Sequence, residues 1–411
     1  MPAGDATIAA LTNILKTRYD QKVFHQMFYR KAPFIGQIRK DEKFGGNNAR
    51  ISLRYGAPQG GSFNLQVAMA NASSSSDVGF LLTRAKDYQV SGISGEALAA
   101  GDGDQNTIYN TLRGEMEGSM RNLNRSLQIC AWRNGGGQRG RLNNSSTATT
   151  VGTLLQAADI VGFEVQMKVD LSVDDGYNNG GALAGVRAGG PLTVVAVDRT
   201  AGTVTFNANI STLTGASTTD FLFRNGDYSL GPAGVARWLP AVAPTAGDSL
   251  FGVDRSVDVV RLAGIRYSGG GSNKEETIID AAELAGREGA EDLTCFINNL
   301  DRADLVKSLG SKALYEPVES TDADIGYRAL QIEGPDSTIK VFSDVNIPRG
   351  TFALLEMDTW VLKSAKGVPR ILDDDGLKML REANNDGYQW RMGGYFQYGC
   401  EAPGYNLQGT W

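Results

Sequence analysis

The residue types that most often do covalent chemistry are scarce in this chain of 411 residues. It contains a single histidine, His25, and three cysteines that lie far apart, Cys130, Cys295 and Cys400. A serine or cysteine nucleophile most often needs a histidine base, and a zinc site usually needs histidines or clustered cysteines. No G-x-S-x-G nucleophile elbow and no G-x-x-x-x-G-K-S/T phosphate loop occurs. We therefore predict no enzyme activity, no metal and no cofactor. We expect His25 to lie on a helix surface and the cysteines to be buried or free thiols in a reducing compartment.

Two short stretches could in principle hold an ion. Residues 269–272 (Gly-Gly-Gly-Ser) precede a helix expected from Lys274, and a helix N-terminus attracts anions. Residues 373–376 (Asp-Asp-Asp-Gly) offer carboxylates, which hard cations prefer, but they lack the twelve-residue spacing and terminal Glu of an EF-hand. We interpret the first as a flexible joint before a helix and the second as a solvated turn.

The bulk composition is that of an ordinary globular chain with an excess of glycine. Apolar residues make up 41% and charged residues 21%, so the chain can bury a core, and its length allows roughly two to four domains. The 51 glycines indicate many turns and hinges. A net charge of −6 without a basic block argues against tight nucleic-acid binding. No apolar run approaches the about 20 residues of a membrane span. We expect a soluble chain, made in the cytoplasm, with no membrane partner.

A long amphipathic helix is expected over residues 107–133. Apolar side chains recur there in steps of three and four, at Ile108, Leu112, Met116, Met120, Leu123, Leu127 and Cys130. This spacing places one apolar stripe on one face of a helix about 40 Å long. The glycine run 135–137 ends it. We expect the helix to run along the back of an elongated subunit, with its stripe packed on a C-terminal strand around Trp390, Tyr395 and Phe396. Arg121 would then lie on the opposite face, in solvent or against a neighbouring subunit.

The segments before this helix predict an arm and a hairpin. Residues 1–34 have the pattern of an amphipathic helix that docks on its own core or on a neighbouring subunit. Residues 50–55 and 62–69 alternate like strands, and residues 80–90 continue in extended style. Few of these side chains are strongly apolar, so a hairpin of this composition has little to bury itself against. We expect either a mobile excursion or a hairpin completed by another chain.

The segments after the helix predict an inserted β domain and then a mixed α and β region. Residues 135–149 resemble a linker of Gly, Asn, Ser and Thr, and a β-rich segment follows to about residue 235. We expect this segment to fold as its own small barrel or sandwich on the outer side of the subunit. Further on we expect helices at 274–288 and at 300–309, the latter capped by Asn298 or Asn299. Strands are expected at 160–171, 191–197, 203–206, 257–265, 293–297, 325–332, 338–342 and 351–357.

The order of these parts resembles that of tailed-bacteriophage major capsid proteins with the Hong Kong 97-type fold. Three stretches are also similar to that family: residues 88–98 (YQVSGISGEAL), 236–262 (ARWLPAVAPTAGDSLFGVDRSVDVVRL) and 391–404 (RMGGYFQYGCEAPG), together with Trp360. The resemblance covers most of the chain outside residues 150–235. It depends on the order of elements and on diffuse patterns, because no catalytic signature is involved.

The resemblance implies an α+β subunit with an N-arm, an E-loop hairpin, a P-domain that holds a long spine helix, and an A-domain. The small inserted β-barrel or sandwich departs from the minimal pattern of the family. The implied segments are the N-arm 1–38, E-loop 39–87, P-domain with spine helix 88–145, inserted β domain 146–238, P-domain return 239–275, A-domain 276–385 and P-domain C-terminal strand 386–411.

The resemblance also implies a function and partners. The chain would be the major capsid protein that self-assembles, as hexamers and pentamers, into the icosahedral shell of a virion around packaged double-stranded DNA, without binding a specific DNA sequence. Portal and scaffold proteins and a possible decoration protein would be its partners. No scaffolding segment precedes the arm, so we expect a separate scaffold protein or a pre-segment that is removed. The alternatives are an encapsulin-like shell of the same fold around protein cargo, and an unrelated carbohydrate-active enzyme, which would need a paired-carboxylate cleft.

Our candidates for subunit contacts are basic and aromatic residues of the hairpin and the long helix, namely Lys43, Arg50, Arg54, Tyr55, Arg84, Lys86 and Arg121. The hairpin arginines could form intersubunit salt bridges, and several together can matter where single exposed pairs do not. Part of the family carries a covalent Lys–Asn cross-link with a Glu nearby. No spacing in this chain singles out such a pair, and we predict no cross-link.

Overall fold

The computed structural model describes residues 32–96, 105–177, 182–309, 330–335, 337–373, 379–382 and 385–411. For residues 105–113 and 309 it describes the backbone alone. Nearly all of the expected N-terminal helix, including His25, lies outside the described residues, and so do residues 374–376 of the acidic turn.

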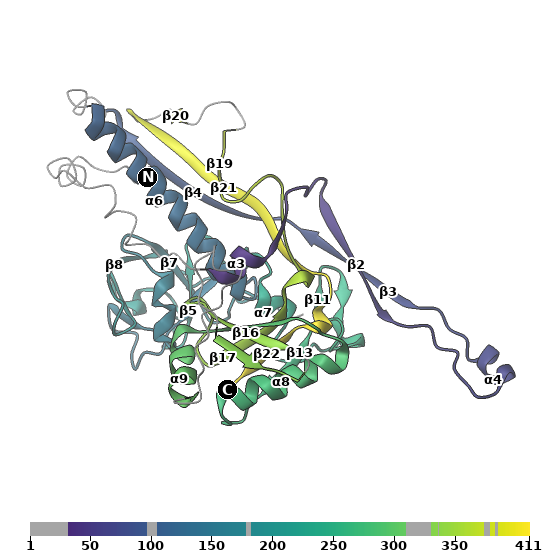
Figure 1. The fold of residues 1–411 in the computed structure, drawn as a ribbon. Helices are drawn as coiled ribbons and strands as arrows, with labels where there is room; N and C mark the ends of the chain where they lie inside the picture. The colour runs from purple at the N-terminus through teal and green to yellow at the C-terminus, as the bar shows by residue number, and fades with distance from the viewer. Residues whose placement is uncertain are drawn as a thin grey trace.

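A long helix lying along a long β-ribbon forms the first of three parts of the molecule (Figure 1). The helix is α6 (Gln105–Trp132), close to the predicted 107–133. The ribbon consists of β4 (Ala85–Ser94) and β21 (Gly387–Cys400), which pair antiparallel from Gly387 opposite Ser94 to Phe396 opposite Ala85. On the other edge of β21 lie β18 (Trp360–Ser364), β19 (Arg370–Ile371) and β20 (Leu380–Arg381). Strand β1 (Arg39–Asp41) runs parallel to β18.

The apolar face of α6 packs on the inner face of this ribbon, as the sequence predicts. Leu123 is 1% exposed and shares a cluster with Trp390, Met392 and Ile93. The expectation was wrong for Tyr395, because residues in a strand alternate between faces and Tyr395 is out of phase with Trp390. Its ring instead meets Tyr88 on the opposite face, with centroids 6.1 Å apart.

A second sheet, with two helices beside it, forms the second part. Its strand order is β13-β22-β17-β14-β16-β15. Helix α8 (Lys274–Glu288) and strand β14 (Leu293–Ile297) have the predicted bounds. Helix α9 (Asn299–Leu309) is capped by Asn298, whose Oδ1 accepts a hydrogen bond from the Leu300 amide. The other strands are β13 (Ile265–Ser268), β15 (Leu330–Glu333), β16 (Thr338–Ser343), β17 (Thr351–Glu356) and β22 (Leu407–Thr410).

In the mixed region one expected strand is wrong, and two sets of strands pair across the segment bounds that the resemblance implies. The strand predicted at 257–265 is largely a turn, and β13 begins only at Ile265. Strands β13 and β22 pair with each other in the second sheet, although the sequence places both segments in the P-domain. Strands β18, β19 and β20 pair with β21 in the first sheet, although their segment is predicted as A-domain.

One aromatic core joins these two parts. Phe34 is fully buried, and its ring centroid lies 5.0 Å from that of Trp132 and 5.7 Å from that of Trp360. Phe296 of β14 adds a tilted contact to Trp132 at 5.5 Å. Since offset and edge-on aromatic pairs add to the free energy of burial, the start of the described chain, the end of α6 and both sheets are held together here.

A third six-stranded sheet forms a separate β unit against the lower half of α6, with strand order β5-β10-β7-β8-β9-β6. The predicted hairpin is present as β8 (Leu192–Asp198) and β9 (Thr203–Phe206). The segment predicted as a linker contains β5 (Gln138–Arg141), which pairs with β10 (Phe221–Arg224). Residues 160–171 are only partly a strand, since the 3-10 helix η1 (Ala157–Gly162) precedes β7 (Lys168–Ser172).

The two edge strands of this β unit meet. After β5, the Asn143 amide donates to the Thr153 carbonyl of β6 (Val151–Thr153) at 2.8 Å. The Leu155 amide donates to the Arg141 carbonyl, also at 2.8 Å. Inside lies a cluster of buried residues that includes Phe163, Val204 and Phe206. The unit therefore has a core of its own.

The remaining short elements connect these parts. They are α3 (Pro33–Gln37), β2 (Asn48–Gly56), α4 (Leu65–Ala70), β3 (Ser76–Thr83), η2 (Ile210–Thr212), α7 (Val235–Trp238), β11 (Ser249–Leu250), β12 (Val253–Asp254), η3 (Arg255–Val257), η6 (Met357–Thr359) and η7 (Pro403–Tyr405).

The packing of α6 leads to a first prediction. Leu123→Ala should lower the free energy of unfolding of the unassembled subunit by about 2–5 kcal/mol, because it leaves a cavity beside Trp390. The matched change Asn122→Ala, on the exposed face of the same helix, should alter it by less than about 0.5 kcal/mol. Urea unfolding of both variants measures this. Equal effects would mean that the helix faces the ribbon differently.

The β unit leads to a second prediction. A fragment of residues 136–235 should give a β-type circular dichroism spectrum and a cooperative thermal melt. A fragment of residues 150–235 should melt at a lower temperature or not cooperatively, because it lacks β5 and exposes the edge of β10. If both fragments melt alike, β5 contributes nothing to the fold of the unit.

Candidate subunit-contact surface

The hairpin of β2 and β3 projects away from the rest of the subunit (Figure 1). The strands pair from Asn48 opposite Thr83 to Gly56 opposite Ser76. At its end the predicted alternation of residues 62–69 is wrong, since the chain forms the short helix α4 instead. The side chain of Asn64 caps this helix by accepting a hydrogen bond from the Gln66 amide at 3.0 Å. Alternation and helical spacing are hard to tell apart over so short a stretch.

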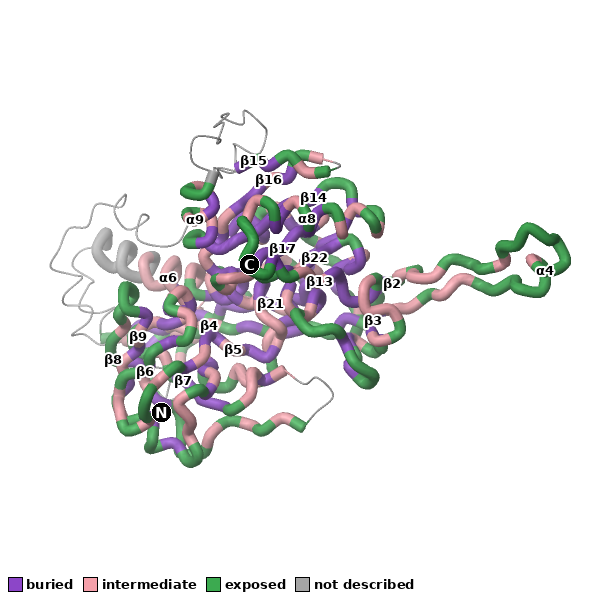
Figure 2. Tube along the Cα trace, turned by 90° about the horizontal axis from the view of Figure 1, so that it is seen from below, coloured by how far each residue is buried: buried purple, intermediate pink, exposed green. Residues whose placement is uncertain are grey.

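Apolar side chains gather at the tip of the hairpin with nothing in the described chain to cover them. Phe63 is fully exposed, Leu65 is 75% exposed and Met69 is 71% exposed. Figure 2 shows the contrast between the exposed tip around α4 and the buried interior of the body. Large apolar side chains grouped on a surface usually mark a contact with another molecule. These residues were not among the predicted contact residues, although Asn64 followed by apolar residues is a cap signal.

The base of the hairpin is firmly held by the body. Phe80 is fully buried, and its ring centroid is 5.0 Å from that of Trp238. On the outer edge of β3, the Thr83 carbonyl accepts a hydrogen bond of 2.9 Å from the Gln397 side-chain amide. Further out, at the end of β2 towards the tip, the Arg261 guanidinium donates to the Tyr55 carbonyl at 2.7 Å. The hairpin therefore has an anchored base and an uncovered tip.

The predicted contact residues of the hairpin lie along its length, and one of them has a partner in the same hairpin. Arg54 forms an ion pair with Asp77 at 2.8 Å, with both side chains more than half exposed. This pair lowers the pKa of Asp77 through its hydrogen bond to Arg54. Arg50 is exposed, and its guanidinium crosses Gly79, where a Cβ would approach Arg50 Nε to 2.4 Å. Tyr55 is half-buried and contributes its carbonyl to the contact with Arg261.

The other predicted contact residues lie nearer the body. Arg84 stacks over the ring of Phe44 at 5.5 Å, and Lys43 and Lys86 are exposed. Arg121 lies on α6 and pairs with Glu117 one turn away at 3.3 Å. The structure therefore gathers most of the candidates on the hairpin and its root, but places Arg121 apart from them.

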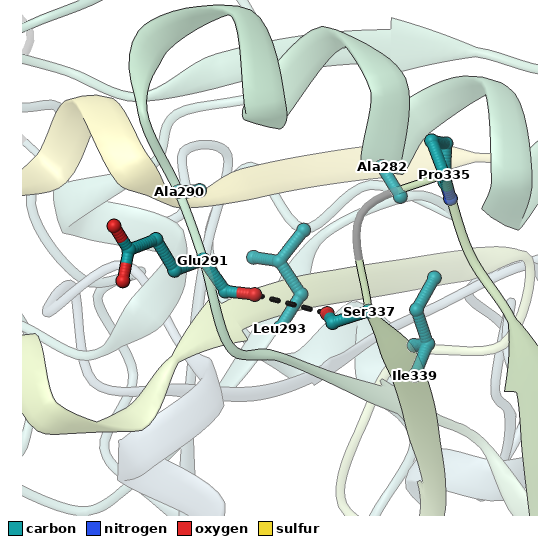
Figure 3. A pocket seen from close by; sticks show the side chains of 7 residues that line it. All are labelled: Ala282, Ala290, Glu291, Leu293, Pro335, Ser337 and Ile339. Carbon is teal, nitrogen blue, oxygen red and sulfur yellow. Dashed lines mark hydrogen bonds between the residues drawn. The ribbon is translucent and has the colours of Figure 1, made fainter.

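A small hollow between α8 and the edge of the second sheet has little capacity to bind a ligand. It is lined by Ala282, Ala290, Glu291, Leu293, Pro335, Ser337 and Ile339 (Figure 3). The Ser337 hydroxyl in this hollow is already engaged, since it donates to the Glu291 carbonyl at 2.9 Å. Within the described residues, no group of three or more His, Cys, Asp or Glu side chains could hold a metal ion, and no helix is long and apolar enough to cross a membrane.

The three cysteines carry no disulfide in this structure. Cys295 and Cys400 are buried, and burial raises the pKa of both thiols, to about 12 for Cys400. The thiolate is the reactive form. These two residues therefore behave as inert core side chains, in agreement with the sequence analysis, whereas Cys130 is only half-buried.

Charged side chains join the β unit to α6 and to the ribbon of β4 and β21. Arg133, the residue after the end of α6, pairs with Asp159 at 2.6 Å, and Arg125 of α6 pairs with Glu164. On the ribbon, Asp87 is 6% exposed and forms an ion pair with Arg224 of β10 at 2.6 Å. Asp87 comes a few residues after the end of β3, at the root of the hairpin. The β unit is thus fixed both to the helix and to the segment from which the hairpin emerges.

Comparison with known proteins gives a fold assignment. No protein-family model matches the sequence, and no curated protein matches it. The structure is similar to a chain of the Cyanophage A-1(L) capsid asymmetric unit, with a TM-score of 0.52 and 12% identity over 96% of this chain and 95% of that chain. The chain has a phage capsid fold. The resemblance stated from the sequence is thereby confirmed at the level of the fold.

Other phage-related shells are similar at lower scores. The capsid of the native GTA particle aligns with a TM-score of 0.49 and 8% identity over 99% of both chains. The capsid of Cyanophage P-SCSP1u aligns with a TM-score of 0.43 and 8% identity over 97% of this chain and 93% of that chain. The assignment of the capsid fold depends on the Cyanophage A-1(L) match alone.

The buried pair of this capsid-fold chain leads to a third prediction. Arg224→Met should reduce the free energy of unfolding by about 3 kcal/mol, because Asp87 stays buried without its cation and Asp227 also loses its ion pair with Arg224. Arg54→Met, which breaks the exposed pair with Asp77, should cost only about 0–1 kcal/mol. Adding Asp87→Asn to Arg224→Met should recover part of the loss. Urea unfolding of the unassembled subunit tests all three, and equal costs for the two arginine variants would contradict the argument.

Proposed function

We propose that this protein is the major capsid protein of a tailed bacteriophage, a structural protein without enzymatic activity that self-assembles into the icosahedral shell around packaged double-stranded DNA. The observation that carries the proposal is the projecting hairpin, whose tip exposes Phe63, Leu65 and Met69 while its base is anchored in the core. A chain that holds out an apolar group on a fixed support is built for contact with another molecule. The capsid fold makes a second copy of the chain the natural partner.

In this proposal the described parts take the roles implied by the sequence resemblance. The hairpin is the E-loop, α6 with its ribbon is the spine of the P-domain, and the sheet beside α8 is the core of the A-domain. The β unit is a small closed barrel, supported by the hydrogen bonds that join the chain after β5 to β6. Arg50, Lys43 and Lys86 remain proposed partners for acidic groups of a neighbouring subunit.

The proposed assembly also defines the environment of the protein. Subunits form hexamers and pentamers after synthesis in the host cytoplasm, and portal and scaffold proteins, with a possible decoration protein, complete the virion. DNA is enclosed without sequence-specific contacts, which agrees with a net charge of −6. No specific observation favours the encapsulin-like alternative.

The first test of the function is electron microscopy of the purified protein, alone and coexpressed with its neighbouring genes. Uniform closed shells are expected, and the DNA-filled form should appear only in infected cells. Dispersed monomers under every one of these conditions would contradict the proposal.

The fourth prediction tests the hairpin tip. Leu65→Asp should leave the unfolding free energy of the unassembled subunit within about 0.5 kcal/mol of the wild-type value, since Leu65 is exposed. It should nevertheless abolish or strongly reduce shell formation, because it places a charge in an apolar contact. The matched control is Gln66→Asp on the same helix, which should assemble. Normal shells from Leu65→Asp would show that the tip is not a contact.

A further inference from the structure

The turn that receives the outer edge of β3 has an unusual residue at its first position. Strands β11 and β12 pair with Leu250 opposite Val253, so Phe251 and Gly252 form a two-residue hairpin turn. Both have positive φ, 48° for Phe251 and 85° for Gly252. Turns of this kind favour Asn, Asp or Gly at the first position, because a bulky side chain is disfavoured in the left-handed region. Phe251 therefore holds a strained backbone conformation.

Two contacts on opposite sides of Phe251 compensate for this strain. Its ring packs on Trp238, with centroids 5.8 Å apart, and Trp238 is fully buried with its indole N–H bonded to the Tyr398 carbonyl. The Phe251 carbonyl accepts a hydrogen bond of 3.0 Å from the Leu81 amide of β3. Trp238 also packs on Phe80, the neighbour of Leu81. The turn, the core tryptophan and the hairpin thus form a closed set of contacts.

We propose that the Phe251 turn is a latch that sets the angle of the hairpin. The Leu81 amide points away from β2, so the Phe251 carbonyl is the group of the body that it meets. The left-handed backbone of Phe251 aims this carbonyl at β3, and the bond to Leu81 in turn helps to keep the backbone in that conformation. When the hairpin is pulled away, the turn loses one of its two supports and can relax, so the latch has two states.

The latch gives the hairpin an adjustable root. A strained conformation persists only where surrounding contacts maintain it, and such positions are suited to switching. Force on the tip from another subunit would act on the Arg261 bond to the Tyr55 carbonyl and on the Leu81 and Thr83 bonds before it disturbs the buried Phe80. The significance for assembly depends on the proposed function, but the latch itself is a property of one subunit.

The test is hydrogen–deuterium exchange of the Leu81 amide in the unassembled full-length subunit. In Phe251→Ala the left-handed conformation is still disfavoured, and the ring that compensates for it is gone. The turn should therefore relax, and the Leu81 amide should exchange about tenfold faster, the effect of losing one hydrogen bond. Phe251→Asn also removes the ring, but Asn tolerates the left-handed region. It should therefore keep more of the protection of Leu81 than Phe251→Ala. Amides of the ladder between β4 and β21 report global stability, and the loss of protection at Leu81 should exceed any loss that they show.

Each outcome decides the proposal. Faster exchange at Leu81 in Phe251→Ala, with partial protection in Phe251→Asn, supports the latch. Unchanged exchange in Phe251→Ala, or equal loss in the two variants, overturns it, because the backbone conformation would then not be what holds the hairpin. If Phe251→Ala fails to fold, Phe251→Ser replaces it with the same expected loss of protection at Leu81, because Ser also lacks the ring and is disfavoured in the left-handed region. Failure of the protein to form shells would count against the proposed function and leave this result intact.

Discussion

The apolar contact between α6 and the inner face of β21 is the constraint on which the rest of the subunit depends. Strand β21 is long enough to pair with β4 on one edge and with β18, β19 and β20 in succession on the other. Such a strand needs cover along its length, and the Leu123 face of α6 supplies it. Where the helix ends, Trp132 enters the aromatic core that also holds Phe296 of the second sheet. The position of the second sheet therefore follows from the position of the helix.

The hairpin and the β unit are joined to this frame by different physical means. The hairpin depends on buried aromatic packing at Phe80 and on a few backbone hydrogen bonds. The β unit is joined largely by ion pairs, with Asp87 and Asp159 both buried. Buried ion pairs are geometrically demanding, because any separation leaves a charge without its partner in a poorly solvated site. The β unit should consequently move with α6 and β4 as one body, while the hairpin can change angle at its root.

How much the sequence could predict depended on whether the signal was local. The patterns that predicted α6, α8 and β14 lie within each element, and their bounds were predicted closely. Strand β5 was missed because Gln138–Arg141 is polar and is a strand only through pairing with β10, about eighty residues away. The tip was misread because Leu65, Val67 and Met69 satisfy alternation as well as a short helix. Arg54 was expected to contact another subunit, but its cross-strand neighbour Asp77 became visible only with the hairpin register.

The contrast between base and tip explains how one hairpin can be both well defined and incomplete. Its apolar residues are divided unevenly, with Ile51, Phe80 and Leu82 in the core and Phe63, Leu65 and Met69 in solvent. Had the tip been polar, the ordered base would have no consequence beyond the subunit, and had the base been loose, the tip would have no defined direction. The buried residues hold the base of the hairpin in place, and the strained turn at Phe251 is a support that can be released. In the proposed latch, the hairpin therefore presents its apolar tip in one direction, and that direction can change when a partner binds.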